Sequence, residues 1–328
     1  MRLLRLLVVI VIALMVTGAV YEQIAERRDR ELLPRVGQAV DVGGYSLNLS
    51  CMGRGIPPVI LDAGAGSPGY SWLPIQTELA KTTQTCWFDR AGEGWSDPGP
   101  FPRTSEAIAT DEHNLLKNAA IAPPYVLVGH SFGGLNARVY AGKYPREVAG
   151  MVLVDAAHED EPSRAPKFML GHSLPRPLWR VNHWAMQGAK RVGLIRLISG
   201  SPQLPSNPTH DQVVAALRKQ PKAVANLGEY VTSPLNYEQA HNAGSIGDKP
   251  LIVLTAGRPW QTGNAKMDRE GNAYRKVWIT EIQPKLAKLS TRGRQIVVAK
   301  SGHGIPEEAP EAVVDAVRDV VGAVRVAP

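Results

Sequence analysis

The sequence has little that points to a metal ion, a nucleotide or a nucleic acid. It holds only two cysteines in 328 residues, and its cysteines and histidines show no spacing typical of a zinc site. It has no Walker loop and no G-x-G-x-x-G after a first strand, the usual signatures of nucleotide and dinucleotide binding. We therefore expect neither a metal nor another cofactor.

The sequence has no run of charges of one sign. Lys and Arg outnumber Asp and Glu by 37 to 30, for a formal net charge of +7, but the basic residues are scattered. A balance of this kind favours solubility and attraction to anionic surfaces, and it does not specify a partner. We expect no nucleic-acid partner, and the oligomeric state stays open. With 44% hydrophobic residues, the chain can build a sizeable core.

The N-terminus carries an uncharged apolar run. Leu6–Val20 follows two arginines, Arg2 and Arg5. The run suits a membrane anchor if it is counted from Leu3, or the apolar core of a signal peptide cleaved near residues 17–19. A core helix is the third reading. We expect residues 1–34 to be an anchor or signal segment with a juxtamembrane helix, and the two arginines to stay in the cytoplasm.

Strand and helix patterns alternate from residue 38 onward. A hairpin is expected over 38–51, and short apolar runs predict buried strands over 58–62, 84–88, 125–128, 148–154, 251–255 and 295–299. Helical patterns separate them over 71–81, 104–120, 132–143, 273–289 and 308–324. This rhythm indicates an α/β fold, a mostly parallel sheet with helices on both faces.

The rhythm breaks between residues 157 and about 248. This segment is rich in proline and amphipathic helical patterns and has no buried strand pattern. A connection of this length within a compact domain is usually a structured insertion. We interpret residues 35–328 as one domain and 157–248 as a helical cap over its site. Trp179 and Trp184 lie in the cap, where they either line a pocket or only hold the cap together.

Residues 129–133, Gly-His-Ser-Phe-Gly, match the pattern G-x-S-x-G between a strand and a helix. This pattern places a serine on a tight turn with its hydroxyl exposed, and the small residues allow the turn to close. Ser131 is therefore the expected nucleophile. The amide of Phe132, at the start of the following helix, is one expected oxyanion donor, and the amide of Ala65, in a glycine-rich loop after an earlier strand, is the other.

A base is expected from the loop that follows the last strand. His303, in Ser-Gly-His-Gly, is the histidine that lies between the terminal strand and the terminal helix. Histidine is suited to take a proton from serine near neutral pH and return it to a leaving group.

These motifs, with the loop at 89–97 (Asp-Arg-Ala-Gly-Glu-Gly-Trp-Ser-Asp), resemble the α/β-hydrolase family across residues 38–325. The resemblance implies an eight-stranded sheet, a Ser-His-acid triad and no cofactor. It also makes the second and fourth strands neighbours, which predicts a disulfide between Cys51 and Cys86 in an extracytoplasmic domain. The alternative is two small buried hydrophobic side chains.

The expected acid is not in its usual place in this family, after the strand at 251–255, where residues 256–261 contain no carboxylate. Asp268 and Glu270 follow only later. Asp155 ends the strand after the elbow helix, at the same sheet edge as Ser131, and some family members carry the acid there. We therefore expect Asp155, with Asp268 in reserve, although Asp155 could instead only cap a turn.

The leading prediction is hydrolysis of a carboxylic ester or related acyl bond in a small molecule. The same triad could instead cleave a carbon–carbon or amide bond or support cofactor-free peroxidation, and a catalytically silent binding protein is the alternative outside enzymes. Family members that open epoxides or remove halogens carry an aspartate where this chain has Ser131.

Overall fold

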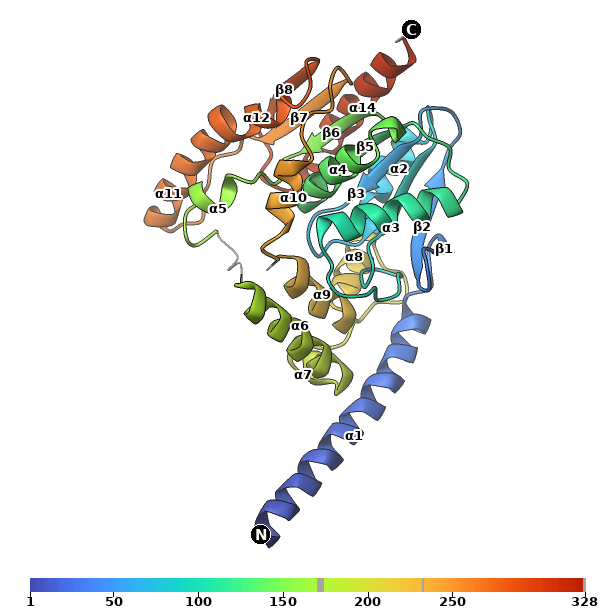
Figure 1. The fold of residues 1–328 in the computed structure, drawn as a ribbon, viewed down its shortest axis with the longest axis vertical. Coiled ribbons are helices and arrows are strands. Elements are labelled where there is room, and N and C mark those ends of the chain that lie inside the picture. Colours follow the sequence, from blue (N-terminus) through green and yellow to red (C-terminus); the bar gives the residue numbers. More distant parts are fainter. Residues whose placement is uncertain (170–173, 232, 327–328) are drawn as a thin grey trace.

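A long helix projects from a rounded body. The computed structural model describes residues 1–169, 174–231 and 233–326. Helix α1 (Arg2–Leu32) leaves the body at one end of the long axis, and the C-terminus lies at the other end (Figure 1). The remaining elements form the body and the cap.

The body is built on one eight-stranded sheet, as predicted. Its order is β1-β2-β4-β3-β5-β6-β7-β8, with β1, β2 and β4 paired antiparallel and every later pair parallel. The central strands are buried on both faces, which explains their continuous apolar runs. The strands are β1 Gln38–Asp41, β2 Ser46–Met52, β3 Val59–Asp62, β4 Thr85–Asp89, β5 Tyr125–His130, β6 Val148–Val154, β7 Leu251–Ala256 and β8 Gly293–Val298.

Helices cover both faces of the sheet and enclose two apolar cores. One core joins the sheet to α3 (Ser105–Asn118), α4 (Phe132–Lys143) and α12 (Gln283–Ala287). The other joins it to α2 (Leu73–Leu79) and α14 (Pro310–Arg325). The short elements are the 3₁₀ turns η1 (Gly69–Trp72) and η2 (Pro145–Glu147) and helix α13 (Ile305–Glu308).

One predicted helix is longer than expected. The pattern predicted a helix over 273–289, but α11 spans Ala265–Val277 and continues through a π turn, η3 (Trp278–Ile282), into α12. The reason is local, because the Asn264 side chain accepts hydrogen bonds from the amides of Lys266 and Met267 and so caps an earlier start.

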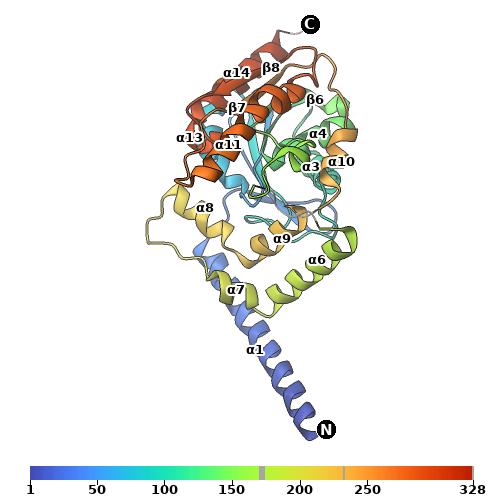
Figure 2. The ribbon, with the colours of Figure 1, turned by 90° about the vertical axis from the view of Figure 1, so that its left-hand side faces the viewer.

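The expected cap segment contains helices α5–α10 in its described part, and Figure 2 shows α6–α9 between the sheet and α1. We use the name cap for residues 157–248. Its helices are α5 Glu161–Arg164, α6 Arg176–Arg191, α7 Leu194–Ser199, α8 His210–Arg218, α9 Pro221–Val231 and α10 Asn236–Asn242.

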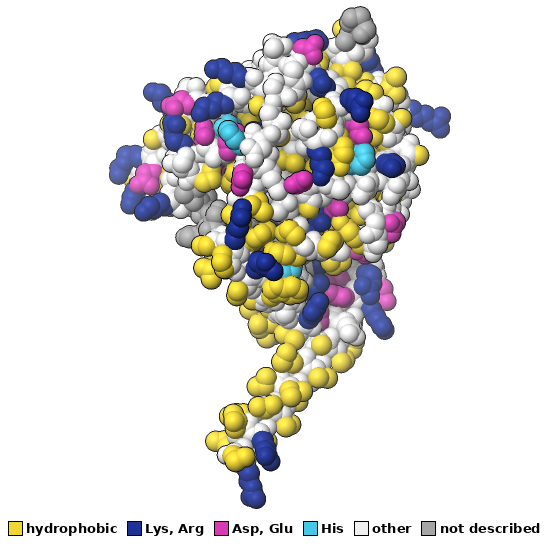
Figure 3. Space-filling view, viewed as in Figure 1, with side chains coloured by type: hydrophobic (Ala, Val, Ile, Leu, Met, Phe, Trp, Pro, Cys, Tyr) yellow, Lys and Arg dark blue, Asp and Glu magenta, His cyan; other side chains and the backbone are white. Residues whose placement is uncertain are grey.

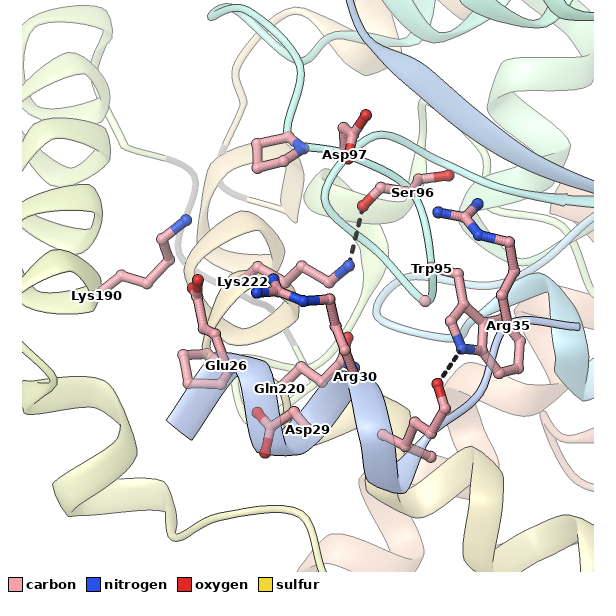
Figure 4. Close-up of a pocket in the computed structure, with 14 residues that line it drawn as sticks. Glu26, Asp29, Arg30, Arg35, Trp95, Ser96, Asp97, Lys190, Gln220 and Lys222 are labelled. Carbon is pink, nitrogen blue, oxygen red and sulfur yellow. Dashed lines mark hydrogen bonds between the residues drawn. The ribbon is translucent and has the colours of Figure 1, made fainter. Parts of the chain in front are cut away.

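The C-terminal end of α1 is fastened to the body. Trp95 Nε1 donates to the carbonyl of Leu33 at 2.9 Å, and Lys222 Nζ donates to the carbonyl of Ser96 (Figure 4). A cavity of about 320 Å³ remains between the end of α1, the loop at 94–98 and the cap. Burial lowers the pKa of Lys222, which lines it, to about 8. This junction therefore sets the direction in which α1 leaves the body.

A disulfide joins Cys51 to Cys86. The two residues are directly opposite each other in the antiparallel pair of β2 and β4. The bond connects the second and third strands in the sheet order across 35 positions of sequence.

Candidate active site

Ser131 occupies a strained turn between β5 and α4. Its φ is 52° and its ψ −116°, a conformation that residues with a side chain rarely adopt. A Cβ on Gly129 would lie 2.4 Å from the carbonyl oxygen of Gly133, and a Cβ on Gly133 would lie 2.4 Å from that of Asp62. The two glycines of the pattern are therefore required because backbone approaches backbone, which is what allows the turn to close.

His303 lies beside this serine. Its Nε2 is 2.9 Å from Ser131 Oγ, although 172 positions separate the two residues. The His303 side chain is 57% exposed, so the pair can be reached from solvent. The structure thus brings the expected nucleophile and base into direct hydrogen-bonding contact.

Asp155 completes the arrangement at the end of β6, with φ at 40°. Its Oδ2 lies 2.7 Å from His303 Nδ1, and its Oδ1 accepts hydrogen bonds from Trp278 Nε1 at 2.7 Å and the amide of Ala256 at 2.9 Å. Burial raises the pKa of Asp155, but the hydrogen bond and charge of His303, together with the hydrogen bonds from Trp278 and Ala256, lower it overall. An ionised Asp155 can only accept, so Nδ1 carries the proton and Nε2 is free to accept from the serine hydroxyl.

The carboxylates beside His303 stabilise its protonated form as well as its orientation. Burial lowers the pKa of His303, but the hydrogen bond and charge of Asp155 outweigh it, and Glu161 adds to them, so the pKa is raised above its ordinary value of 6.5. His303 is therefore a stronger base than a free imidazole.

Two side chains that the sequence did not single out position the His303 loop. His130 Nε2 lies 2.9 Å from the carbonyl oxygen of His303, and burial lowers the pKa of His130 to about 3, so the ring stays neutral. Glu308 Oε2 accepts from the amide of Gly302 at 2.6 Å and from the hydroxyl of Ser301 at 3.0 Å. The one sequence signal was the adjacency of His130 to the elbow serine.

The expected oxyanion loop lies against the serine. A Cβ on Gly64 would be 3.5 Å from Ser131 Cβ, and Ala65 lines a cavity together with Ser131. Phe132 is the first residue of α4, so its backbone amide lies at the N-terminus of that helix. The buried guanidinium of Arg90 orders the loop by donating to Asp62 and to the carbonyls of Ala63 and Gly64.

The reserve acid lies elsewhere. Asp268 is in α11, where its Oδ1 accepts from the amide and the hydroxyl of Thr262 at 2.6 and 2.7 Å. These bonds organise the turn that precedes the helix. Of the two carboxylates weighed from sequence, Asp155 is the one that the structure places against His303.

Two cavities open on the pair of Ser131 and His303. One, of about 450 Å³, is mainly apolar and is lined also by Phe168, Met169, Trp260, Met267, Tyr274 and Trp278. The other, of about 650 Å³, lies between the loop at 64–67 and the cap residues Arg218, Ala223, Val224 and Leu227. We call them the aromatic cavity and the cap cavity. A bond held at Ser131 could have one substituent in each.

The sequence left open whether Trp179 and Trp184 line a pocket or only hold the cap together. Trp179 is buried against Phe101, with ring centroids 4.8 Å apart, and Trp184 is 61% exposed. Neither lines either cavity beside Ser131. The aromatic side chains around the serine come mostly from α11 and the segments that flank it. Arg275 and Trp278 of that region bond to Ala256, at the end of β7, and to Asp155, just after β6.

A second carboxyl group lies in the aromatic cavity. Glu161, the first residue of α5, lines it together with Ser131 and His303. Burial raises the pKa of Glu161 to about 7, against the opposing effect of His303. Among the described residues, no group of three or more His, Cys, Asp or Glu side chains is arranged to hold a metal ion.

A family model and curated relatives match this chain. The model, described as the alpha/beta hydrolase family, matches residues 59–316. An "AB hydrolase superfamily protein" of Gibberella zeae is 24% identical over 287 residues, which cover 82% of this chain and 87% of that protein. The uncharacterized protein YbdG of Bacillus subtilis is 27% identical over 151 residues, so the chain spans 46% of its length. For a probable transporter of Hormonema carpetanum the share is 22%.

Solved structures share the fold. A thermophilic esterase from Thermogutta terrifontis superposes with a TM-score of 0.59 at 20% identity, covering 88% of this chain and 99% of that one. A putative epoxide hydrolase from Pseudomonas aeruginosa superposes with a TM-score of 0.62 at 17% identity, covering 89% and 97%. At these identities the likeness concerns the fold alone.

Proposed function

Because the chain belongs to the alpha/beta hydrolase family, we propose that it is a serine hydrolase that cleaves a carboxylic ester through Ser131, His303 and Asp155. One observation carries the proposal: Ser131 Oγ lies 2.9 Å from His303 Nε2, while His303 Nδ1 lies 2.7 Å from Asp155 Oδ2. This relay gives the hydroxyl a base and the base a fixed tautomer.

The reaction follows from the positions of these atoms. Ser131 Oγ attacks the ester carbonyl carbon as its proton passes to His303 Nε2, and the imidazolium is stabilised by Asp155. Collapse of the tetrahedral intermediate breaks the bond to the alcohol oxygen, which receives the proton from His303. Water then attacks the acyl-enzyme with His303 as base again, which releases the acid and restores Ser131.

The amides of Phe132 and Ala65 are the proposed oxyanion donors. Support comes from the position of Phe132 at the N-terminus of α4 and from the contact of the loop at 63–66 with Ser131. The hydrogen bonds from Arg90 keep that loop in one conformation before substrate binds. Both amides are thus preorganised toward the oxygen of the tetrahedral intermediate, where negative charge develops.

The two cavities suggest an ester with a sizeable group on each side of the scissile bond. The aromatic cavity suits an apolar group, and the cap cavity has an apolar wall from Ala223, Val224 and Leu227. A short, fully polar ester would leave much of both surfaces uncovered.

Membrane attachment through α1 is part of the proposal. Among the described helices, α1 is the one long and apolar enough to cross a membrane. With Arg2 and Arg5 on the cytoplasmic side, the catalytic body would lie outside it, either anchored or, after cleavage of the segment, released. The disulfide between Cys51 and Cys86 suits such an oxidising location.

A fluorophosphonate probe and a panel of p-nitrophenyl esters of rising chain length test the proposal. We expect the probe to label Ser131, identified by peptide mass spectrometry, and Ser131→Ala to lose the label and at least about 10³-fold in kcat. A labelled protein that leaves every ester intact would favour amide or carbon–carbon cleavage. Retained esterase activity in Ser131→Ala would overturn the assignment, and no labelling at all would favour a silent binding protein.

A further inference from the structure

Helices α6 and α7 expose an apolar surface on the side of the cap that adjoins α1. In Figure 3 hydrophobic side chains gather on this part of the body and continue onto the projecting helix. Leu197 is 79% exposed and Ile198 78%. We define the apolar cap face by its exposed side chains: Leu178, Val181, Trp184, Leu194, Leu197 and Ile198. An exposed apolar surface of this kind is unfavourable in water unless another apolar phase covers it.

The position of this face along α1 is set by a close contact. The corner between α6 and α7 touches the apolar run of α1, since a Cβ on Gly18 would lie 2.3 Å from the carbonyl oxygen of Val192. A span of about 20 residues crosses the hydrocarbon core, and counted from Leu3 it ends at Glu22. Gly18 lies four residues before Glu22, or about 6 Å along the axis. The corner therefore lies within about 6 Å of the end of the apolar span.

A buried ion-pair network holds α7 at this level. Arg196, in α7, is 2% exposed and donates to both carboxylate oxygens of Glu22 at 2.9 Å and to Asp29 at 2.8 and 3.2 Å. Paired guanidinium–carboxylate bonds fix orientation as well as distance. The cap and α1 are therefore joined rigidly, and the apolar cap face keeps its height when α1 is inserted.

Charge around the face suits a lipid surface. Residues 162–210 contain no Asp or Glu but seven Lys and Arg. Three of the arginines, Arg176, Arg180 and Arg191, are exposed on α6. An interfacial helix combines apolar side chains that enter the acyl boundary with basic side chains that meet anionic headgroups.

We propose that α6 and α7 lie in the headgroup region of the same membrane that α1 crosses, with the apolar cap face turned toward the acyl chains. This inference rests on the anchoring proposed above. Helix α9, which packs on both α6 and α7, supplies Ala223, Val224 and Leu227 to the wall of the cap cavity. The cap cavity thus stands directly on the docked helices, and the substrate class it favours is an ester dissolved in the bilayer.

Nitroxide labels on the full chain test this placement. The two native cysteines form a disulfide, so a single added cysteine can be labelled alone. The protein is placed in nanodiscs of phosphatidylethanolamine and phosphatidylglycerol, with labels at Leu197→Cys, Ile10→Cys or Ile56→Cys. Ile56 is the matched control because it is 76% exposed and bonds through its carbonyl to Arg325, in the C-terminal helix at the opposite end of the molecule (Figure 1).

The readout is relaxation of each label by oxygen, which partitions into lipid, against a water-soluble nickel chelate. We expect oxygen to dominate at positions 197 and 10 and the chelate to dominate at 56. Dominance of the chelate at 197 with oxygen still dominant at 10 would overturn the cap placement and leave the anchor intact. Dominance of the chelate at 10 would remove the anchor and the cap placement together. Spin–spin broadening at 197 that disappears on dilution with unlabelled protein would show a second copy on the face instead of lipid.

Discussion

At the scale of single residues, the site holds two residues in backbone conformations that cost free energy. Ser131 and Asp155 both have positive φ, at 52° and 40°, without being glycine. Such a conformation costs on the order of 1–3 kcal/mol for each residue and persists where the surroundings impose it. Here the amide of Ser131 donates to the carbonyl of Val154, and the amide of Asp155 donates to that of Leu254. The folded sheet therefore offsets a local cost that places both side chains at one edge.

Replacing the elbow serine by glycine tests this strain. We expect Ser131→Gly to abolish turnover and to stabilise the fold by about 1 kcal/mol, because glycine adopts positive φ without a Cβ penalty. Ser131→Ala, which keeps the Cβ, is the matched control and should show no such gain. Urea unfolding of both variants gives the comparison. An equal or lower stability of Ser131→Gly would mean that the turn is not strained.

The two carboxylates weighed as the triad acid give a second prediction. Asp155→Asn should lower kcat by about 10³- to 10⁴-fold with little change in KM, because an amide cannot stabilise the imidazolium or hold its tautomer. Asp268→Asn, the matched control, removes the charge of a surface carboxylate that accepts from Thr262 and should leave kcat nearly unchanged. Steady-state kinetics on one ester decides between them. A large loss in Asp268→Asn alone would move the acid to α11.

The pH profile carries a third prediction. The pKa of His303 is raised, so kcat/KM should rise with pH through a midpoint above 6.5, where the ring loses its proton and becomes a base. Since the charge of Glu161 contributes to raising that pKa, Glu161→Gln should shift the midpoint to lower pH. Glu281→Gln, an exposed change at a partner of Arg164, is the control. An unshifted profile for Glu161→Gln would show that the carboxyl does not act on His303.

At the scale of elements, the segment after β7, rather than Trp179 and Trp184 of the cap, supplies most of the aromatic side chains near Ser131. Trp260, Tyr274 and Trp278 line the aromatic cavity, and Trp278 also donates to Asp155. One element thus both shapes the cavity and holds the acid. The cap contributes Phe168 and Met169 to the same wall, and its α8 and α9 residues line the other cavity.

Trimming that wall should alter substrate preference. We expect Trp260→Ala to move the optimum on the p-nitrophenyl ester panel toward longer or bulkier groups, because removal of the indole enlarges the aromatic cavity. Trp184→Ala removes the same side chain from an exposed position outside both cavities, so the profile of the detergent-solubilised enzyme should not change. A proportional loss on every ester in Trp260→Ala would count against a role in binding either half of the substrate.

At the scale of the whole molecule, the sheet, the cap and α1 are joined to one another. The sheet carries Ser131, His303 and Asp155 at one edge, the cap stands over that edge, and α1 is fastened to both through Arg196 and through Leu33. The disulfide ties β2, the neighbour of the edge strand β1, to β4. The body is therefore held at a set position relative to whatever surface α1 enters.

The disulfide predicts where the body resides. Protein from its native source, alkylated before and after reduction, should show no free thiol at Cys51 or Cys86 until it is reduced, since an oxidising compartment preserves the bond. Reduction should lower the free energy of unfolding by about 2–4 kcal/mol. Recovery of both cysteines as alkylated thiols before reduction would place the body in a reducing compartment.

Much of the fold and of the candidate site could be predicted because the signals are local. The glycines around Ser131 reflect a turn that only small residues allow, the apolar runs reflect strands buried on both faces, and Asp155 follows directly from the end of one of them. Each of these features depends on a few neighbouring positions in the sequence. The missed start of α11 was local as well, in the Asn264 cap.

What the tertiary structure alone decided depends on contacts between distant segments. The bond of His130 to the His303 backbone joins positions 173 apart, and the pairing of Arg196 with Glu22 joins positions 174 apart. The same origin explains why Trp260 and its neighbours, rather than Trp179 and Trp184, line the cavity wall. Amphipathic periodicity shows that a helix has an apolar face, but the partner of that face is set by packing across the whole chain. The sequence by itself therefore determined the sheet and the strand ends that carry Ser131 and Asp155, while packing decided which side chains enclose them.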